Sequence, residues 1–282
     1  MLLEINGNQL NVEVLGDDDP AKPVLIGHHG APGLGSLDEP RAAFGPLADM
    51  FRVLLFDARG SGASGDVGPF THEQWVADVD ALREWIGVER FVMAGGSYGG
   101  FISMEYAVRH PERLSALVLR DTSADNTHEE SAEQNAKGSD RIEFDEEIFR
   151  RVMDGRVHDN ADLRDAWEYL LPLYNHELDR DTIAERVANT PYHYATHNHA
   201  FAVNRLSYDV KPELHNVTCP TLITVGRHDW ITPVSASERI HELIPHSELV
   251  IFEKSGHSPP LEEPERFQHV VRDFLQRAMS AV

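Results

Sequence analysis

The sequence predicts an α/β fold, with a mostly parallel twisted sheet, helices on both faces and an inserted helical cap. Short apolar runs such as Phe51–Asp57 and Leu114–Leu119 alternate with helix-compatible segments, which is the pattern of buried parallel strands joined by helical crossovers. Residues 122–207 interrupt this alternation, because they are rich in charge, histidine and aromatic residues and offer no apolar strand. We therefore expect residues 1–121 and 208–282 to form a core domain and residues 122–207 to form the cap.

The amino-terminal part opens with two β-prone runs, Leu2–Ile5 and Gln9–Leu15, around an Asn-Gly-Asn turn, which predicts a hairpin. A buried strand is expected at Pro23–His28. A glycine-rich loop, Gly30–Gly35, follows it, and a helix is then expected up to about Met50.

The strand Phe51–Asp57 runs into a loop at Ala58–Gly65. Thr71 with Gln74 has the spacing of a capping box and starts the next helix. The apolar face of that helix consists of Trp75, Val79, Leu82 and Ile86.

The carboxyl-terminal part returns to strand-helix alternation. Strands are expected at Thr221–Val225 and Glu248–Phe252, with a helix near Ser235–Leu243 between them. A last amphipathic helix carries its apolar residues on one face: Phe267, Val270, Val271, Phe274, Leu275 and Ala278.

The rest of the chain is organised around the stretch Phe91–Gly100. Within it, Gly95–Gly99 fits the pattern G-x-S-x-G of a nucleophile elbow, which holds a serine on a strained turn between a strand and a helix. The apolar run before Ser97 and the helix-compatible segment Phe101–Arg109 after it supply that context. Glycines flank the serine because bulky neighbours would collide at such a turn. Ser97 is therefore the predicted nucleophile.

A serine hydroxyl is a poor nucleophile at neutral pH, so it needs a base, and the base needs an acid that orients it. In this type of fold the acid and then the histidine follow the serine along the chain. Asp229 and His257 come in that order and each follows a predicted strand, so both are expected to reach Ser97. Asp121 is an alternative acid, because it also ends a strand.

A tetrahedral intermediate needs backbone N–H donors for its oxyanion. Tyr98, which follows the nucleophile, offers one at a helix N-terminus. The glycine-rich loop after the Pro23–His28 strand offers the second, and Ala31 is the predicted donor.

This arrangement of Ser97, Asp229 and His257 resembles the α/β-hydrolase superfamily over most of the chain outside the cap. Three motifs are more particular and are similar to those of proline iminopeptidase-like serine hydrolases: His29-Gly30-Ala31-Pro32-Gly33, the loop that starts at Asp57, and Gly95-Gly96-Ser97-Tyr98-Gly99-Gly100. The resemblance implies that the following residues support the loops around the site without taking part in the chemistry: His29, Gly30, Gly33, Asp57 and Arg59.

The cap departs from that family. Those peptidases bind a free N-terminal amine with cap glutamates, and this chain has Pro191 where one of them would fall. Acidic residues that are candidates to replace it are Glu168, Glu177, Glu185 and Asp209. The motifs favour an aminopeptidase that cleaves an N-terminal residue or small amide, and Pro191 keeps a carboxylesterase or lactonase as the alternative.

No metal or organic cofactor is expected. The spacing of His193, His197 and His199 is compatible with metal ligands, but no acidic or cysteine partner is fixed nearby and the serine mechanism needs no metal. The cap aromatics are predicted to form the core of the cap, with some facing the pocket: Trp167, Tyr169, Tyr174, Tyr192, Tyr194 and Phe201.

The composition limits the partners. The chain of 282 residues has 47 acidic against 25 basic residues and a formal net charge of -22, which disfavours nucleic acid and an anionic membrane surface. Neither a membrane span nor a secretory signal is evident. Cys219, the only cysteine, cannot form an internal disulfide, so a cytoplasmic location is expected. We expect a small-molecule or short-peptide substrate and a monomer or homodimer.

Other activities occur on this scaffold. Two alternatives remain: a non-catalytic ligand receptor, and a cofactor-free haloperoxidase or oxygenase. Hydrolysis with Ser97 as the nucleophile is a simpler prediction than either of them. Dehalogenases and epoxide hydrolases of this fold generally use aspartate at the elbow, so Ser97 disfavours both.

Overall fold

An eight-stranded sheet forms the centre of the molecule in the computed structural model, which describes residues 1–177 and 179–280. Its order is β1-β2-β4-β3-β5-β6-β7-β8. The strands are β1 (Leu2–Ile5), β2 (Asn8–Leu15), β3 (Val24–His28), β4 (Arg52–Phe56), β5 (Phe91–Gly96), β6 (Leu114–Arg120), β7 (Thr221–Gly226) and β8 (Ser247–Phe252). The β1-β2 and β2-β4 pairs are antiparallel and all other neighbours are parallel, which confirms the predicted hairpin and mostly parallel sheet.

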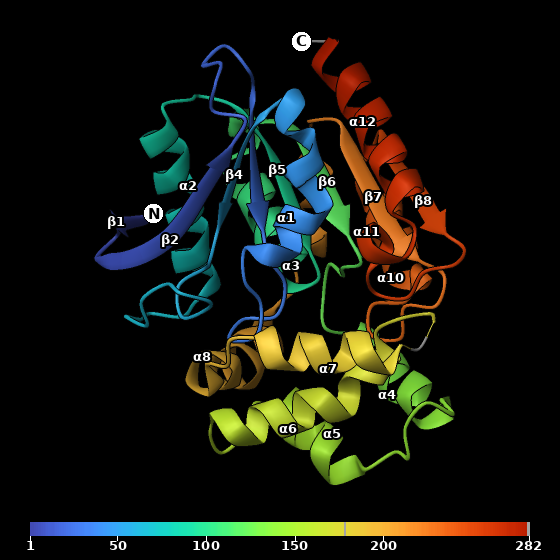
Figure 1. Cartoon of the computed structure of the whole chain (residues 1–282). Helices are drawn as coiled ribbons and strands as arrows, with labels where there is room; N and C mark the ends of the chain where they lie inside the picture. Colours follow the sequence, from blue (N-terminus) through green and yellow to red (C-terminus); the bar gives the residue numbers. More distant parts are fainter. Residues whose placement is uncertain (178, 281–282) are drawn as a thin grey trace.

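The central strands β3, β5, β6 and β7 are buried along their whole length because both faces of the sheet are covered. On β3, Val24 and Ile26 pack into one apolar cluster and Leu25 into the cluster on the opposite face. The same period of two recurs on β4 and β5. Helices α2 (His72–Ile86), α3 (Tyr98–Arg109) and α10 (Val234–Leu243) contribute to the first cluster, and α1 (Asp38–Phe44) and α12 (Pro264–Ser280) to the second (Figure 1).

The helix expected up to about Met50 is shorter in the structure. The α-helical part ends at Phe44 and a 3₁₀ turn, Gly45–Asp49, continues it. Pro46 explains the change, because proline has no N–H for the helical hydrogen-bond ladder and clashes with the preceding turn.

Only one of the two hydrogen bonds of the predicted capping box forms at the start of α2. Thr71 Oγ1 accepts a hydrogen bond from the backbone N–H of Gln74 at 3.3 Å. The Gln74 side chain donates to Asp78 Oδ1 at 2.9 Å instead of turning back to Thr71. The four apolar residues predicted to face the core are buried: Trp75, Val79, Leu82 and Ile86.

A group of helices lies between β6 and β7 in sequence and, in space, beyond the carboxyl ends of the parallel strands (Figure 1). These helices are α4 (His128–Gly138), α5 (Glu146–Met153), α6 (Asn160–Leu170), α7 (Arg180–Asn189), α8 (Tyr194–His199) and, after a π-helical turn, α9 (Arg205–Ser207). Within residues 122–177 and 179–207 there is no strand. The extent of this segment as a separate cap domain stays a prediction.

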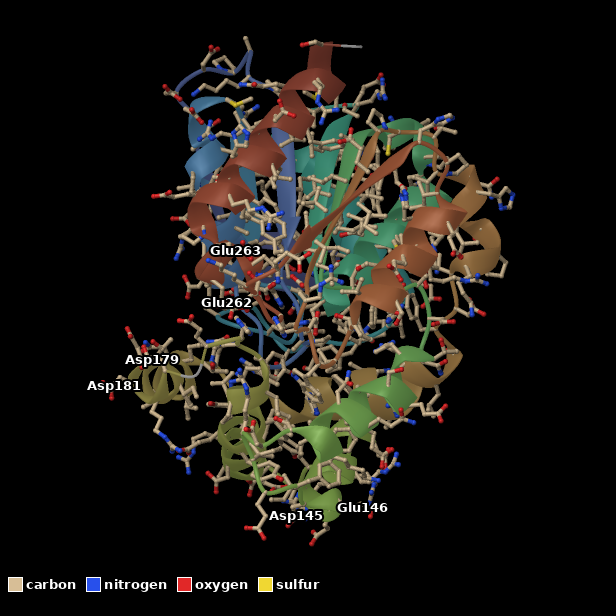
Figure 2. The ribbon with its side chains drawn as sticks, turned by 90° about the vertical axis from the view of Figure 1, so that its right-hand side faces the viewer. Asp145, Glu146, Asp179, Asp181, Glu262 and Glu263 are labelled. Atoms are coloured by element: carbon tan, nitrogen blue, oxygen red, sulfur yellow. The ribbon has the colours of Figure 1, made fainter. Side chains whose placement is uncertain are left out.

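Aspartates begin several of these helices. Asp145 Oδ1 accepts hydrogen bonds from the N–H groups of Glu147 and Ile148, and Asp179 caps α7 in the same way. Figure 2 shows both aspartates at the outer ends of their helices. The helices bury an apolar cluster of their own, which includes Phe149, Leu163 and Leu170 and extends to Trp230 of the core.

The turn from β5 into α3 holds Ser97 in a strained conformation, with φ of 53° and ψ of -125°. Close packing around this turn explains the glycines beside it. A Cβ on Gly99 would lie 2.4 Å from the carbonyl oxygen of His29 and 2.6 Å from that of His28. Both oxygens are backbone atoms and cannot move aside as the end of a side chain could. Strand β3 and helix α3 therefore approach this closely only because residue 99 is glycine.

We predict that Gly99→Ala destabilises the protein and Gly138→Ala does not. An added Cβ at Gly99 forces β3 and α3 apart, at a cost of ~1–3 kcal/mol, or about 2–10 °C in Tm. Gly138, at the end of α4, is the matched control, because an added Cβ there would have no atom within 4 Å. Thermal unfolding of both variants checks this, and an unchanged Tm for Gly99→Ala would contradict the packing described for the elbow.

Candidate active site

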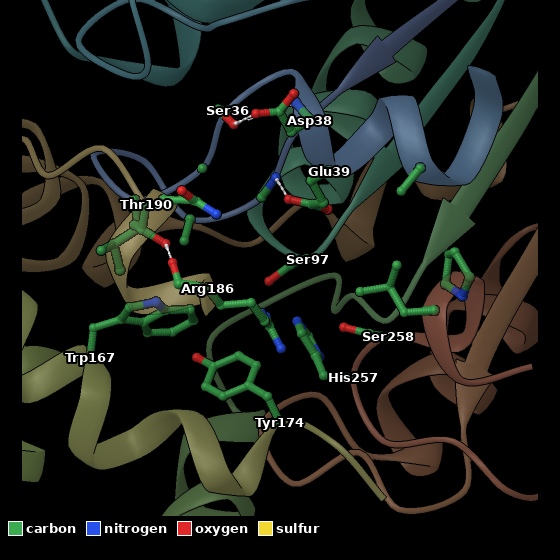
Figure 3. Close-up of a pocket in the computed structure, with 18 of the residues that line it drawn as sticks. Ser36, Asp38, Glu39, Ser97, Trp167, Tyr174, Arg186, Thr190, His257 and Ser258 are labelled. Carbon is green, nitrogen blue, oxygen red and sulfur yellow. Dashed lines mark hydrogen bonds between the residues drawn. The ribbon is translucent and has the colours of Figure 1, made fainter. Parts of the chain in front are cut away.

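Ser97 lies at the floor of a pocket of about 310 Å³ between the sheet and the helices beyond it. The β5-α3 turn leaves the serine half-buried, although its neighbours in the turn are buried. Core loops form one wall of the pocket and Trp167, Tyr174 and Arg186 belong to the opposite one. Figure 3 shows Ser97 and His257 pointing toward one another inside it.

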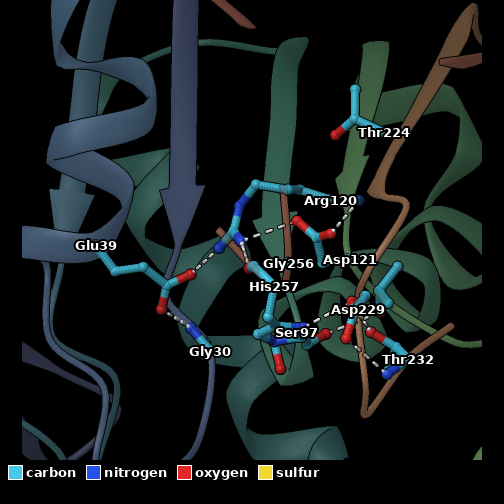
Figure 4. A network of polar contacts seen from close by, with 12 residues as sticks. Gly30, Glu39, Ser97, Arg120, Asp121, Thr224, Asp229, Thr232, Gly256 and His257 are labelled. Carbon is cyan, nitrogen blue, oxygen red and sulfur yellow. Dashed lines mark hydrogen bonds and ion pairs between the residues drawn. The ribbon is translucent and has the colours of Figure 1, made fainter. Parts of the chain in front are cut away.

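His257 and Asp229 are joined by a hydrogen bond. His257 Nδ1 lies 2.8 Å from Asp229 Oδ2, and both side chains are buried. Asp229 Oδ1 accepts from the N–H groups of Ile231 and Thr232 at 3.0 and 3.1 Å, and Thr232 Oγ1 donates to Oδ2 at 2.8 Å (Figure 4). These bonds hold the carboxylate so that the imidazole carries its proton on Nδ1 and leaves Nε2 as an acceptor.

The Nε2 atom of His257 is buried and has no hydrogen-bond partner among the described residues. Such an atom is costly unless a ligand or reacting group uses it. Burial opposes the charged form of this imidazole, but the Asp229 carboxylate and its hydrogen bond outweigh burial and raise the pKa of His257 above its ordinary value. The raised pKa means that the ring binds a proton more readily than an ordinary histidine.

Asp121, the alternative acid, lies behind this pair. Asp121 Oδ1 accepts from the Gly226 N–H at 2.9 Å, and its Oδ2 faces Arg120 Nη1 at 3.2 Å. Burial raises the pKa of Asp121, the Arg120 guanidinium opposes this, and the Asp229 carboxylate reinforces it. The structure thus places Asp229, and not Asp121, against the imidazole.

Asp121, Asp229 and His257 have ligand-type atoms within 4.8 Å of one another, and they form the metal-compatible cluster found in the described part of the chain. The contacts above already engage the two carboxylates with Arg120, Thr232 and the imidazole, so the cluster is accounted for without an ion. Two of the cap histidines whose spacing is compatible with metal ligands contact backbone carbonyls instead. His193 Nε2 faces the carbonyl oxygen of Gly62, and His197 Nε2 faces that of Val152.

Ala31 and Tyr98, the predicted oxyanion donors, flank the pocket differently, since Ala31 lines it and Tyr98 directly follows Ser97. Ala31 lines the pocket, and Tyr98 is the first residue of α3, where the N–H groups have no partner inside the helix. Within the described chain neither N–H donates to another residue. Ala31 is fixed from the other side, since its carbonyl accepts from Leu34 and Gly35.

The residues predicted to support the loops make hydrogen bonds between segments near the pocket, and their supporting role stays a prediction. His29 Nδ1 faces the Gly30 carbonyl at 2.7 Å while its Nε2 accepts from the Ala58 N–H at 2.9 Å, which joins two loops. Gly33 has a φ of 77° and donates its N–H to Ser61 Oγ at 2.9 Å.

Asp57 and Arg59 act from deeper in the core. Asp57 accepts from the Leu37 N–H at 2.6 Å and from the Ala63 N–H at 2.8 Å. Arg59 makes a two-pronged ion pair with Asp78, with both N···O distances at 2.9 Å. Neither of them reaches the pocket.

Sequence reasoning missed an ion pair between the half-buried Glu39 and the buried Arg120. Arg120 Nη2 donates to Glu39 Oε1, and its Nη1 donates to the His257 carbonyl at 3.0 Å. Glu39 Oε2 accepts from the Gly30 N–H at 2.6 Å (Figure 4). The pair connects the loop that carries Ala31 with the loop that carries His257. A signal existed for Arg120, the one charged residue in the apolar strand β6.

The helical side of the pocket differs from the expectation drawn from the peptidases. Pro191 lines the pocket, whereas none of the acidic candidates is among the described lining residues: Glu168, Glu177, Glu185 and Asp209. Trp167 and Tyr174 are the predicted cap aromatics that face it. Arg186, which sequence reasoning did not single out, also lines it.

Comparison with known proteins gives consistent matches over most of the chain. Residues 23–264 match a family described as the alpha/beta hydrolase fold. The proline iminopeptidase PfmaB of Pestalotiopsis fici is 32% identical over 279 residues, which cover 98% of this chain and 99% of that protein. The predicted resemblance to proline iminopeptidases is thereby confirmed.

Solved structures agree with this fold. A thermophilic esterase from Thermogutta terrifontis has a TM-score of 0.77 and 26% identity, with 99% of this chain and 98% of that chain covered. The enol-lactonase from Burkholderia xenovorans has a TM-score of 0.78 and 24% identity, with 98% and 100% covered.

We predict that Asp229→Asn and Asp121→Asn differ in their effect on turnover. The amide in Asp229→Asn would still fill the site but would favour the wrong imidazole tautomer, so kcat should fall by about 10³–10⁴-fold. Asp121 makes no hydrogen bond to the imidazole, so Asp121→Asn should keep kcat within about tenfold of the wild type. Ester hydrolysis followed by absorbance measures both, and a larger loss for Asp121→Asn would reverse the assignment of the acid.

The pH profile provides the control for folding. His257 must be neutral to accept a proton, and its pKa is raised, so kcat/KM of the wild type should be lost as pH falls through a value above about 6.5. Asp229→Asn removes the charge that raises this pKa, so the inflection of its residual activity should move to lower pH.

Proposed function

This chain belongs to the alpha/beta hydrolase family and is a serine hydrolase, and from that premise we propose that Ser97, His257 and Asp229 are its catalytic triad. The observation that carries the proposal is the bond of 2.8 Å between His257 Nδ1 and Asp229 Oδ2, with the unpaired Nε2 turned toward the pocket that Ser97 lines. Asp229 orients the ring, and Nε2 is left to serve the serine.

In the proposed reaction Ser97 Oγ attacks the substrate carbonyl while His257 Nε2 takes its proton. The negative charge that develops on the carbonyl oxygen is stabilised by the N–H groups of Ala31 and Tyr98. His257 gives the proton to the leaving group, and an acyl-enzyme on Ser97 remains. A water molecule, deprotonated by the same imidazole, then releases the acid and restores the serine.

We propose a carboxylic ester or lactone as the substrate class. A free N-terminal amine needs an unpaired carboxylate, and the two acidic side chains on the pocket wall are already engaged: Asp38 pairs with Arg41 and Glu39 with Arg120. Pro191 and Arg186 occupy the helical wall. An ester or lactone requires only the triad and the oxyanion donors.

An aminopeptidase is the second candidate. PfmaB, the relative that is 32% identical, is named a proline iminopeptidase, and the three motifs around the site are similar to those of that family. The two candidates share every catalytic step and differ in what the helical wall must bind.

We also propose that residues 122–207 act as a cap over the pocket, supported by their position beyond the strand ends and by their own apolar cluster. The structure describes no helix that is long and apolar enough to cross a membrane. A cytoplasmic location stays a prediction from the single cysteine, and the choice between monomer and homodimer stays open.

We predict that the protein hydrolyses a short-chain p-nitrophenyl ester and that Ser97→Ala lowers kcat by about 10⁴-fold or more, because the triad acts as a unit. Prolyl p-nitroanilide and its N-acetylated form, tested beside the ester, separate the two candidates. Fast release from the free-amine anilide alone would favour the aminopeptidase. Unchanged turnover by Ser97→Ala would reject the triad itself.

A further inference from the structure

Arg186 brings a positive charge to the pocket wall, and none of the described carboxylates forms an ion pair with it. Among the described residues no carboxylate lies within 4.0 Å of its guanidinium, as an ion pair requires. Its side chain donates one hydrogen bond, from Nη1 to Asn175 Oδ1 at 3.1 Å. A guanidinium has five N–H donors in a planar fork, so most of its capacity is unused by the described chain.

The other charged groups of the pocket wall do not share this property. Glu39 and Arg120 neutralise one another, and the exposed Asp38 pairs with Arg41. His257 is matched by Asp229. Among the described residues of the wall, Arg186 is therefore the charged group without an ion-pair partner, and its charge is positive.

The position of Arg186 makes this charge available to a substrate. Figure 3 shows its side chain reaching from α7 into the pocket that Ser97 and His257 also line. The rings of Trp167 and Tyr174 belong to the same wall. A group bound at the guanidinium would thus be part of the molecule whose carbonyl meets the serine.

The surroundings also make the charge costly when the pocket is empty. Burial lowers the pKa of the Arg186 guanidinium, while the Tyr174 phenol and the carboxylates of Glu39 and Glu262 act in the opposite direction without contacting it. Arginine nevertheless stays charged in proteins. A partly desolvated guanidinium without a counter-ion gains most from a ligand that supplies one in two-pronged geometry.

We propose that Arg186 determines specificity by binding a carboxylate on the substrate, so that the enzyme acts on esters or lactones of carboxylate-bearing acids. This inference rests on the proposed ester or lactone hydrolysis and deepens it. A net charge of -22 repels anions over the surface as a whole, so a local cation inside the pocket is what an anionic substrate needs. Arg186 is a binding residue in this account, and the triad reaction is unchanged.

The test compares matched esters that differ only in the distal group. Mono-p-nitrophenyl esters of succinate, glutarate and adipate carry a free carboxylate at increasing reach, and the corresponding p-nitrophenyl methyl diesters are neutral. Ser97→Ala provides the blank, because it corrects for the hydrolysis that these esters undergo without the triad.

We expect the wild type to prefer at least one carboxylate ester over its methyl ester, and Arg186→Gln to abolish that preference. A charge-assisted hydrogen bond in such a site corresponds to about 10–100-fold in kcat/KM for the carboxylate ester. Because Arg186 lines the pocket, the readout is the ratio of kcat/KM between each carboxylate ester and its methyl ester, and thermal unfolding checks that the variant is folded. Arg186→Lys should recover part of the preference, since it keeps the charge and loses the planar fork.

Arg180→Gln is the matched control, because it makes the same charge change on the same helix α7 at an exposed residue outside the pocket wall. It should leave the preference intact. Calorimetric titration of adipate and glutarate into the wild type and Arg186→Gln gives a second readout, in which only the wild type should bind.

Three results overturn the inference. The wild type prefers no carboxylate ester, or Arg186→Gln keeps the preference, or Arg180→Gln loses it equally. Failure of the proposed function looks different, because methyl esters would then turn over equally in the wild type and in Ser97→Ala. The two sets of results thus distinguish a wrong substrate class from a wrong catalytic mechanism.

Discussion

The close approach of backbone at the β5-α3 turn is the constraint on which the rest of the site depends. Ser97 has a positive φ, a conformation that costs of the order of 1–3 kcal/mol in a residue with a side chain and persists only when its surroundings impose it. The surroundings do so through glycines. Gly99 lets α3 sit against the carbonyl groups of His28 and His29, and Gly96 leaves room for the Arg120 guanidinium, whose Nη2 would lie 2.0 Å from an added Cβ. The glycines beside Ser97 therefore have two effects. They allow the strained turn that projects the serine toward the pocket, and they leave room for the arginine that contacts the neighbouring loops.

Around this turn, charge and hydrogen bonding join elements that are distant in sequence. Arg120 at the end of β6 contacts Glu39 of α1 and the carbonyl of His257 after β8. Through Glu39 it also fixes the Gly30 N–H, one residue from the proposed oxyanion donor Ala31. A displacement of any one of these loops would thus be felt by the donor, the base and the pocket wall. The ion pair between the buried Arg120 and the half-buried Glu39 is best understood as positioning, because the cost of desolvating Arg120 offsets much of the attraction.

Much of the core of this arrangement is predictable from sequence because it depends on local rules. The elbow pattern needs only glycines at fixed offsets, and the strand-end rule is enough to bring Asp229 and His257 near Ser97, where the structure does place them. The strand-end rule could not distinguish Asp121 from Asp229, because each of them follows a strand. Their hydrogen bonds distinguish them, since Asp121 accepts from Gly226 and Asp229 from Thr232. Glu39 and Arg186 carried no usable signal. Each is an ordinary charged residue on a helix, and its surroundings are created by packing against segments far away in the chain.

Labelling of the protein with a fluorophosphonate, followed by peptide mass mapping, tests the central claim most directly, because the reagent modifies a hydroxyl only when a neighbouring base activates it. The account predicts one adduct, on the peptide that contains Ser97, and a strongly slowed reaction in His257→Ala. An unlabelled Ser97 in active protein, or an adduct that forms equally fast without His257, would contradict it.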